Sequence, residues 1–170
     1  LAEAAWQRMN GSFQSAAWLG WVKKLPDKLI RTRPVLCTQI AQAFTDTGEL
    51  EASELRLQDA ERCLDGSELA NEAQLKPLPA MIALTRAYNA QVQGDPAATV
   101  KYAELALQLI PEDDFDRRAR AINILEVIHW ASGNLESAIR GLSDWMESMT
   151  QLGNHVFVFA SAFAVADMLV

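Results

Sequence analysis

The chain has 170 residues, enough for one domain with a buried core, and half of these residues are hydrophobic. Its formal net charge of −7 argues against nucleic-acid binding by the chain as a whole, because phosphates attract an excess of Lys and Arg. Its two cysteines provide no disulfide framework, and no basic region followed by an apolar run opens the chain, so a cytoplasmic protein is expected. The chain begins without Met and stops in an apolar run, so we expect it to come from a longer polypeptide.

The segment 20–37, GWVKKLPDKLIRTRPVLC, differs in charge from the rest of the chain. It carries five basic side chains and the single acid Asp27, so it is +4, and the remaining residues together carry −11. It also contains Trp21, Pro26 and Pro34. From charge alone it could be a nucleic-acid patch, a linker or a more specific element.

Four glycines recur at intervals of 37, 46 and 39 residues, which is the scale of a helix–turn–helix repeat: Gly11, Gly48, Gly94 and Gly133. Each follows one apolar helix-like segment and precedes another. We expect each glycine to end a helix in the left-handed conformation that other residues disfavour. Asp95 and Asn134, which come directly after two of them, are expected to cap the next helix.

These turns predict an all-α fold of antiparallel helix pairs stacked as a tetratricopeptide-like, right-handed superhelical solenoid. The whole of 1–170 is expected to be a single helical-repeat domain. Residues 65–79, DGSELANEAQLKPLP, are expected to be an inserted loop or short helical turn closed by two prolines. The expected helix pairs cover about 1–25, 34–64, 79–110 and 116–150, and an unpaired helix follows at 155–170.

The third unit matches the tetratricopeptide pattern at Gly94, Tyr102, Ala106 and Pro111, where small residues allow close helix approach and proline stops the second helix. The acids and bases that follow Pro111 could form a binding cluster. Their order, acids first, favours instead the capped start of a helix, because carboxylates are stabilised at the positive end of the helix dipole.

The sequence contains no pattern typical of a catalytic or metal site, such as GxxxxGK[ST], GxSxG, HExxH or paired CxxC. His129 and His155 lie apart and lack ligand partners at a suitable spacing. We therefore expect no enzyme activity, no metal and no cofactor in this chain. Cys37 and Cys63 could approach each other in an antiparallel helix pair, where two reduced core thiols are favoured over a regulatory disulfide.

Residues 85–140 resemble the helical repeat region of MalT-like, LuxR-type transcriptional activators. The segment from Trp21 to Leu36 resembles a recurring signature of the same family, W-x-x-x-L-P-x-x-L-x-x-x-R-P-x-L. Its matching residues are Trp21, Leu25, Pro26, Leu29, Arg33, Pro34 and Leu36. In 85–140 the matching residues are Arg86, Ala87, Gly94, Asp95, Ala106, Leu107, Pro111, Glu112, Asp113, Gly133, Leu135 and Ala138.

The resemblance implies that the basic segment is a connector, in which Pro26 ends one helix and Pro34 opens the next. It also implies a larger regulator with an ATP-binding module upstream and a DNA-binding helix-turn-helix at the C-terminus, neither of them in this chain. The repeat region would bind an inducer, which is either a small molecule or a protein. This binding would change the oligomerisation of the regulator. The alternative is a peptide-binding tetratricopeptide scaffold outside any transcription factor, and a third, weaker reading is an enzyme accessory domain.

Two residues depart from the repeat pattern. Glu126 stands seven residues before Gly133, where Ala41 and Ala87 precede their glycines. Trp145 occupies the position of a small residue twelve after the glycine. Because an unpaired buried carboxylate is costly, we expect Glu126 to face solvent or to find a partner.

In tetratricopeptide superhelices the first helix of each pair lines the concave face. Projecting that pattern from the glycines places Thr45, Leu84 and the candidate residues named below on this face. Their side chains could hydrogen-bond to a polar organic ligand and stack on it. An ordinary solvated groove is the plainer interpretation, and Trp6, Trp18 and Trp21 are expected to be core or capping residues. The candidate ligand-binding residues are Thr38, Gln42, Tyr88, Gln91, Arg120, Asn123 and Trp130.

The apolar run at 156–170 is too short for a membrane span, which needs about 20 residues, and Asp167 interrupts it. It predicts a buried helix and no membrane association. If this helix has no second member, its apolar face should pack on another chain, so we expect self-association through the 155–170 end.

Overall fold

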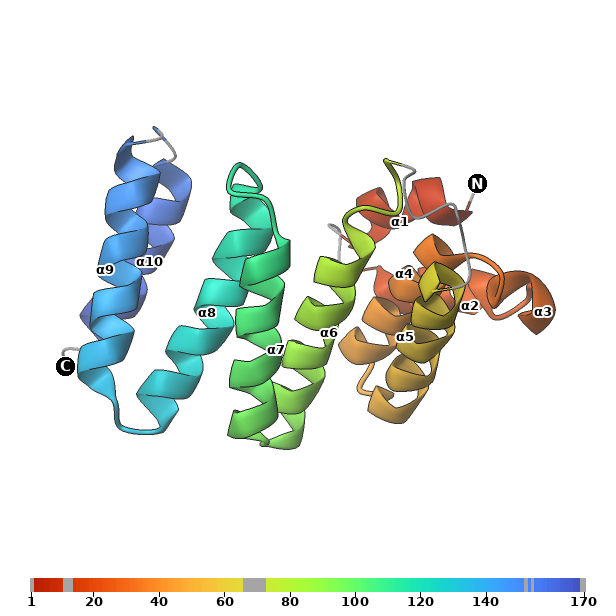
Figure 1. Ribbon diagram of the computed structural model, residues 1–170, viewed down its shortest axis with the longest axis horizontal. Coiled ribbons are helices and arrows are strands. Elements are labelled where there is room, and N and C mark those ends of the chain that lie inside the picture. Colours follow the sequence, from red (N-terminus) through yellow and green to blue (C-terminus); the bar gives the residue numbers. More distant parts are fainter. Residues whose placement is uncertain (1, 11–13, 66–72, 152, 154, 169–170) are drawn as a thin grey trace. The chain divides into compact units, whose positions relative to one another are not determined.

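The computed structural model describes residues 2–10, 14–65, 73–151, 153 and 155–168, and in these ranges it is all-helical, with ten helices and no strand (Figure 1). The predicted all-α class is confirmed. The helices divide within α6 into two compact units, unit 1 (Leu1–Asn89) and unit 2 (Ala90–Val170). The stacking of helix pairs into a right-handed superhelix stays a prediction.

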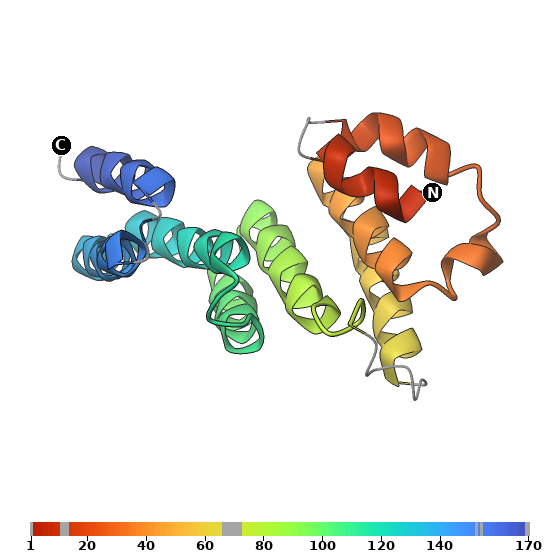
Figure 2. The ribbon, with the colours of Figure 1, turned by 90° about the horizontal axis from the view of Figure 1, so that it is seen from above.

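Unit 1 is built around the antiparallel pair α4 and α5, against which the N-terminal helices pack. α1 and α2 contact each other and α4, and Figure 2 shows them lying across one side of α4. Its helices are α1 (Ala2–Asn10), α2 (Ser15–Val22), α3 (Asp27–Ile30), α4 (Pro34–Asp46), α5 (Leu50–Asp65) and α6 (Leu78–Gln93) as far as Asn89.

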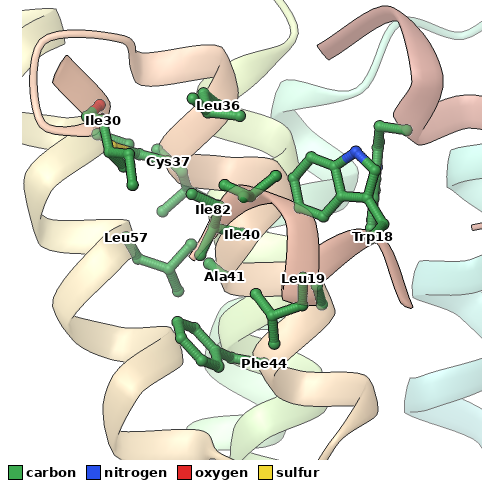
Figure 3. Packing of buried hydrophobic residues seen from close by; sticks show 14 residues of the cluster. Trp18, Leu19, Ile30, Leu36, Cys37, Ile40, Ala41, Phe44, Leu57 and Ile82 are labelled. Carbon is green, nitrogen blue, oxygen red and sulfur yellow. The ribbon is translucent and has the colours of Figure 1, made fainter. Parts of the chain in front are cut away.

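The core of unit 1 gathers side chains from most of its helices (Figure 3). Trp18 is fully buried, its indole nitrogen donates to the Ala2 carbonyl at 3.0 Å, and its ring lies 4.7 Å from that of Trp6. Leu57 of α5 and Ile82 of α6 also belong to the cluster, and in Figure 3 Leu57 lies on the side away from Trp18. Trp6 and Trp18 are therefore core residues, as expected, whereas Trp21 is 59% exposed.

Unit 2 is a sequence of helices that pack on their neighbours in chain order: α7 on α8, α8 on α9 and α9 on α10. Small residues line the contacts, and Ala103, Ala106 and Ala121 are fully buried. Ala106, a small residue of the predicted repeat pattern, is therefore buried, and the close helix approach stays a prediction. The helices are α7 (Pro96–Leu109), α8 (Phe115–Ala131), α9 (Leu135–Gln151) and α10 (His155–Met168).

The turns after α4, α6 and α8 share one hydrogen-bonding pattern. The glycine N–H donates to the carbonyl three residues back, at 2.9–3.1 Å, and the next N–H donates to the carbonyl five residues back, at 2.8–2.9 Å. This is the Schellman motif, and it requires a left-handed residue. Gly48, Gly94 and Gly133 have φ of 79°, 71° and 76°, as predicted, and Gly153 adds a further turn with φ 71° before α10. Gly11 lies outside the described residues.

The predicted caps are also present. The Asp95 side chain accepts the Ala98 N–H at 3.0 Å, and the Asn134 side chain accepts the Ser137 N–H at 3.3 Å. The acid-rich run after Pro111 supplies a third cap, since Asp114 accepts the Arg117 N–H at 3.3 Å. Asp114 therefore caps α8 and Asp116 lies in its first turn, as the order of charges indicates.

The two prolines of the basic segment differ in outcome. Pro34 is the first residue of α4, as predicted. Pro26 was expected to end the preceding helix, but α2 ends at Val22 and Pro26 instead directly precedes the one-turn helix α3. Of the insertion predicted at 65–79, residues 66–72 lie outside the described residues, and 73–77 form turns before α6.

We predict that replacing Gly48 by Ala destabilises unit 1 by about 1–2 kcal/mol, the cost of forcing a Cβ into the left-handed region. No atom lies within 4 Å of an added Cβ there, so the cost comes from backbone strain alone. Urea unfolding of the purified variant measures it.

Gly20 provides the matched control, because an added Cβ there also has no atom within 4 Å, but the residue lies in α2. Gly20→Ala should leave stability unchanged or raise it by about 0.5–1 kcal/mol. Equal effects of the two substitutions would contradict the role given to the left-handed turn.

Candidate functional site

One face of α8 carries three of the candidate ligand-binding residues. Arg120, Asn123 and Trp130 are exposed, Trp130 at 46%, and their spacing of three and seven residues places them on one side of the helix. We call these three residues the α8 face. Arg120 is paired with Asp116, one turn earlier, at 3.0 Å. The α8 face thus offers a guanidinium, an amide and an aromatic ring to a polar partner.

The other candidate residues are placed differently. Thr38 is fully buried and its hydroxyl donates to the Pro34 carbonyl at 2.9 Å, so it presents no group to a surface ligand. Gln42 is half-buried on α4, and Tyr88 is 39% exposed on α6 within unit 1. Gln91 is half-buried and belongs to unit 2. Thr38 and Gln42 share α4, and Tyr88 and Gln91 share α6, but among the described helices only α8 carries three candidate residues that are all exposed.

Thr45, which the same projection put on the concave face, takes part in a buried polar network. Its hydroxyl donates to Asn89 Oδ1 at 2.7 Å and lies 3.1 Å from the Ser53 hydroxyl. Asn89 Nδ2 in turn donates to Ser53 Oγ at 3.0 Å. This network joins α4, α5 and α6, and it satisfies polar groups that would be costly to bury unpaired. Thr45 is half-buried with its hydroxyl engaged in this network, and Leu84 is buried, so neither residue presents its side chain freely to a ligand.

Arg86, a residue of the family resemblance, has a structural role in unit 1. Its guanidinium contacts Glu54 at 2.7 Å and Glu61 at 2.6 Å, both on α5. The hydrogen bonds that Arg86 donates to Glu61 and Glu54 raise its pKa above its already high usual value. This fork of charge-assisted bonds holds α6 against α5.

The basic connector 20–37 is docked on its own unit by acidic residues. Asp27 accepts from Arg31 at 2.6 Å and from Arg56 of α5 at 2.5 Å. The buried Asp59 of α5 accepts from Arg56 at 3.0 Å and also contacts Arg62. The hydrogen bond from Arg56 is the main reason that the pKa of Asp27 lies below its usual value.

Two further basic residues of the connector pair with other helices. Arg33 donates to Glu3 of α1 at 3.0 Å, and Lys23 contacts Glu49 at 3.3 Å. Several of the positive charges that set the segment apart are therefore neutralised within unit 1. This pairing supports the connector interpretation over a nucleic-acid patch, which would leave these charges for phosphates.

Both thiols donate hydrogen bonds to backbone carbonyls at the end of α3. Cys37 Sγ donates to the Ile30 carbonyl at 3.2 Å, and Cys63 Sγ donates to the Arg31 carbonyl at 2.9 Å. Both cysteines are free, and burial raises the pKa of Cys37 to about 12 and also raises that of Cys63. High thiol pKa values disfavour the reactive thiolate. Cys37 is a core thiol as expected, whereas Cys63 is only half-buried.

The two departures from the repeat pattern are both buried in unit 2. Trp145 is accommodated in the core at 9% exposure. The expectation for Glu126 was wrong on both alternatives: the side chain is 7% exposed, and its Oε2 atom has no hydrogen-bond partner among the described residues.

α10 presents aromatic rings at its surface. Phe159 and Phe163, one turn apart, are 69% and 68% exposed, and their ring centroids lie 5.3 Å apart in an edge-to-face arrangement. Ala162 and Ala166 are exposed on the same helix. The described part of α10 is therefore not a buried helix as predicted, but one with an apolar exposed side.

Among the described helices, none combines the length and apolarity needed to cross a membrane. The described residues also contain no group of three or more His, Cys, Asp or Glu side chains placed to hold a metal ion. No family model, curated protein or solved structure matches this chain.

We predict that Asp59→Asn destabilises unit 1 by about 2 kcal/mol, because it removes the buried charge with which Arg56 and Arg62 form ion pairs. Chemical unfolding monitored by circular dichroism measures the loss. Asp65→Asn, an exposed change at the end of the same helix, should have little effect. If Asp59→Asn were as stable as the parent protein, the connector would not depend on this network.

Proposed function

We propose that this chain is an effector-sensing and interaction segment of a MalT-like, LuxR-type transcriptional regulator, with ATP binding and DNA binding in separate modules. The observation that carries the proposal is the α8 face, where a guanidinium, an amide and an indole ring are exposed together on one helix. The repeated glycine turns and the residues that resemble the family support it.

The mechanism follows from the chemistry of the α8 face. Arg120 can exchange its solvent-exposed pairing with Asp116 for a carboxylate or phosphate of a ligand, because an exposed ion pair contributes little stability. Trp130 can stack on an apolar or aromatic group, and Asn123 can donate and accept hydrogen bonds. A ligand that prefers one arrangement of the helices shifts the population toward it, and self-association of the regulator changes accordingly.

We expect small anionic or aromatic molecules that raise the melting temperature of the protein to bind less tightly to Arg120→Ala and Trp130→Ala, by about tenfold each. A thermal-shift screen followed by calorimetric titration measures this. Arg140→Ala is the control for Arg120, since Arg140 is exposed on α9 and pairs with Glu136 in the same i,i+4 geometry. Trp21→Ala is the control for Trp130.

The outcomes separate the two candidate functions. Binding of a small molecule that requires Arg120 and Trp130 supports the sensor. Binding of extended peptides alone, through the same residues, supports the peptide-binding scaffold instead. A broad screen without any hit, or hits unaffected by both α8 variants, would refute the α8 face as the ligand site.

The proposal also includes self-association through α10, whose exposed Phe159 and Phe163 form an apolar surface. Replacing both with Ser should weaken the association at least about tenfold, because two large apolar side chains lose their burial. Sedimentation equilibrium measures this. Leu55→Ser, at a 62% exposed position on α5, should leave it unchanged. If the chain without substitutions is monomeric at high concentration, this part of the proposal is contradicted.

A further inference from the structure

Glu126 is a carboxyl group buried between helices without a counter-charge. It lies on α8, which packs against α7 and α9, and only 7% of its surface is exposed. Its Oε2 atom has no hydrogen-bond partner in the described part of the chain. An ionised carboxylate in such a place is strongly disfavoured, whereas the neutral acid is tolerated.

Gly141 of α9 makes this placement possible. A Cβ at Gly141 would stand 2.7 Å from the carboxyl carbon of Glu126 and closer still to Oε1, so the carboxyl group occupies the space of the missing side chain. An interior glycine weakens a helix, and close approach of a neighbouring group is a physical reason to have one. Glu126 and Gly141 therefore form a matched contact between α8 and α9.

No charged group from the packed helices compensates Glu126. The charged residues of α7 and α9 are exposed, and desolvation is the single cause that raises the pKa of Glu126, from 4.5 to about 7. His129, on α8 itself, is half-buried and makes no contribution to that shift. The exposed charged residues are Lys101 and Glu104 on α7, and Glu136, Arg140, Asp144 and Glu147 on α9. On α8, Asp116 and Arg120 are exposed and Arg117 and Arg118 are half-buried near its start.

We propose that Glu126 is protonated when α8 and α9 are packed together, and that its ionisation loosens this helix pair, which makes unit 2 a pH-dependent conformational element. The sign follows from linkage: a carboxyl group that holds its proton more tightly in the folded state stabilises the fold at low pH. That stabilisation is complete below about pH 4.5 and is lost as pH rises through about 7. The element acts near neutral pH and is independent of the proposed ligand.

Hydrogen exchange of the whole chain between pH 5.5 and 8.5, corrected for the intrinsic chemical rate, tests the proposal. We expect the protection of amides in α8 and α9 to fall by up to about 30-fold over this range, the loss that a shift from 4.5 to about 7 allows. Amides of α4 and α5 in unit 1 serve as the internal reference, because Glu126 does not lie in that unit.

Two variants separate Glu126 from other titrating groups. Glu126→Gln keeps the shape of the side chain and removes the group that titrates. The protection of amides in α8 and α9 should therefore become nearly independent of pH. Glu147→Gln, at an exposed position of α9, should keep the pH dependence of the parent protein. If Glu126→Gln retained the parent's dependence, His129 or another group would be responsible and the proposal would be overturned.

A direct titration of the Glu side chains tests the proposal even if a variant fails to fold, because it is made on the protein without substitutions. Carbon-13 NMR of the labelled Glu side chains in the parent protein should show one carboxyl group titrating near 7. Gly141→Ala should move that group toward 4.5, because the new Cβ displaces the carboxyl group toward water. A parent protein in which every Glu titrates near 4.5 would refute the buried neutral acid.

Discussion

The last carbonyls of a helix need hydrogen-bond donors, and at the turns after α4, α6 and α8 the backbone after a left-handed glycine supplies them. At Gly48, Gly94 and Gly133 the chain reverses direction immediately, and the residue after the glycine starts the next helix. The reversal is what places successive helices side by side within each unit. Contacts between the paired helices, and the faces that they leave exposed, depend on it.

Within that arrangement, buried polar groups connect the helices in specific places. In unit 1 the Thr45, Ser53 and Asn89 side chains satisfy one another across three helices, and Arg86 joins α6 to two carboxylates of α5. Such networks are costly unless complete, so they favour one register of packing over others. In unit 2 the single carboxyl group of Glu126 instead lies against a glycine, and its Oε2 has no partner among the described residues. The proposed ionisation of Glu126 would make the helix contacts of unit 2 depend on pH near neutrality.

Much of the local structure could be predicted from the sequence, because turns and caps depend on residues close in the chain. Gly48, Gly94, Gly133 and the caps Asp95 and Asn134 are examples. What depends on distant residues could not be predicted. Thr38 was placed by an ideal register on an open face, yet it is buried.

The connector and Glu126 show the same limit. Asp59 looks like a surface residue of an amphipathic helix, and its burial depends on arginine partners. One of these partners is Arg31 of the connector, whose Nε lies 3.9 Å from Asp59 Oδ2. Glu126 looked misplaced in the repeat because the glycine that makes room for it lies on the next helix. The α8 face could be predicted because all of its residues lie on one helix with exposed positions.

If these helix pairs are the sensing segment of a regulator, as we propose, the other modules of that regulator are encoded on either side of them. Sequencing the reading frame around this segment is therefore the decisive experiment. We expect a GxxxxGK[ST] phosphate-binding loop between a strand and a helix upstream, and a helix-turn-helix downstream. A reading frame that carries neither would contradict the regulator assignment and would leave a helical interaction scaffold.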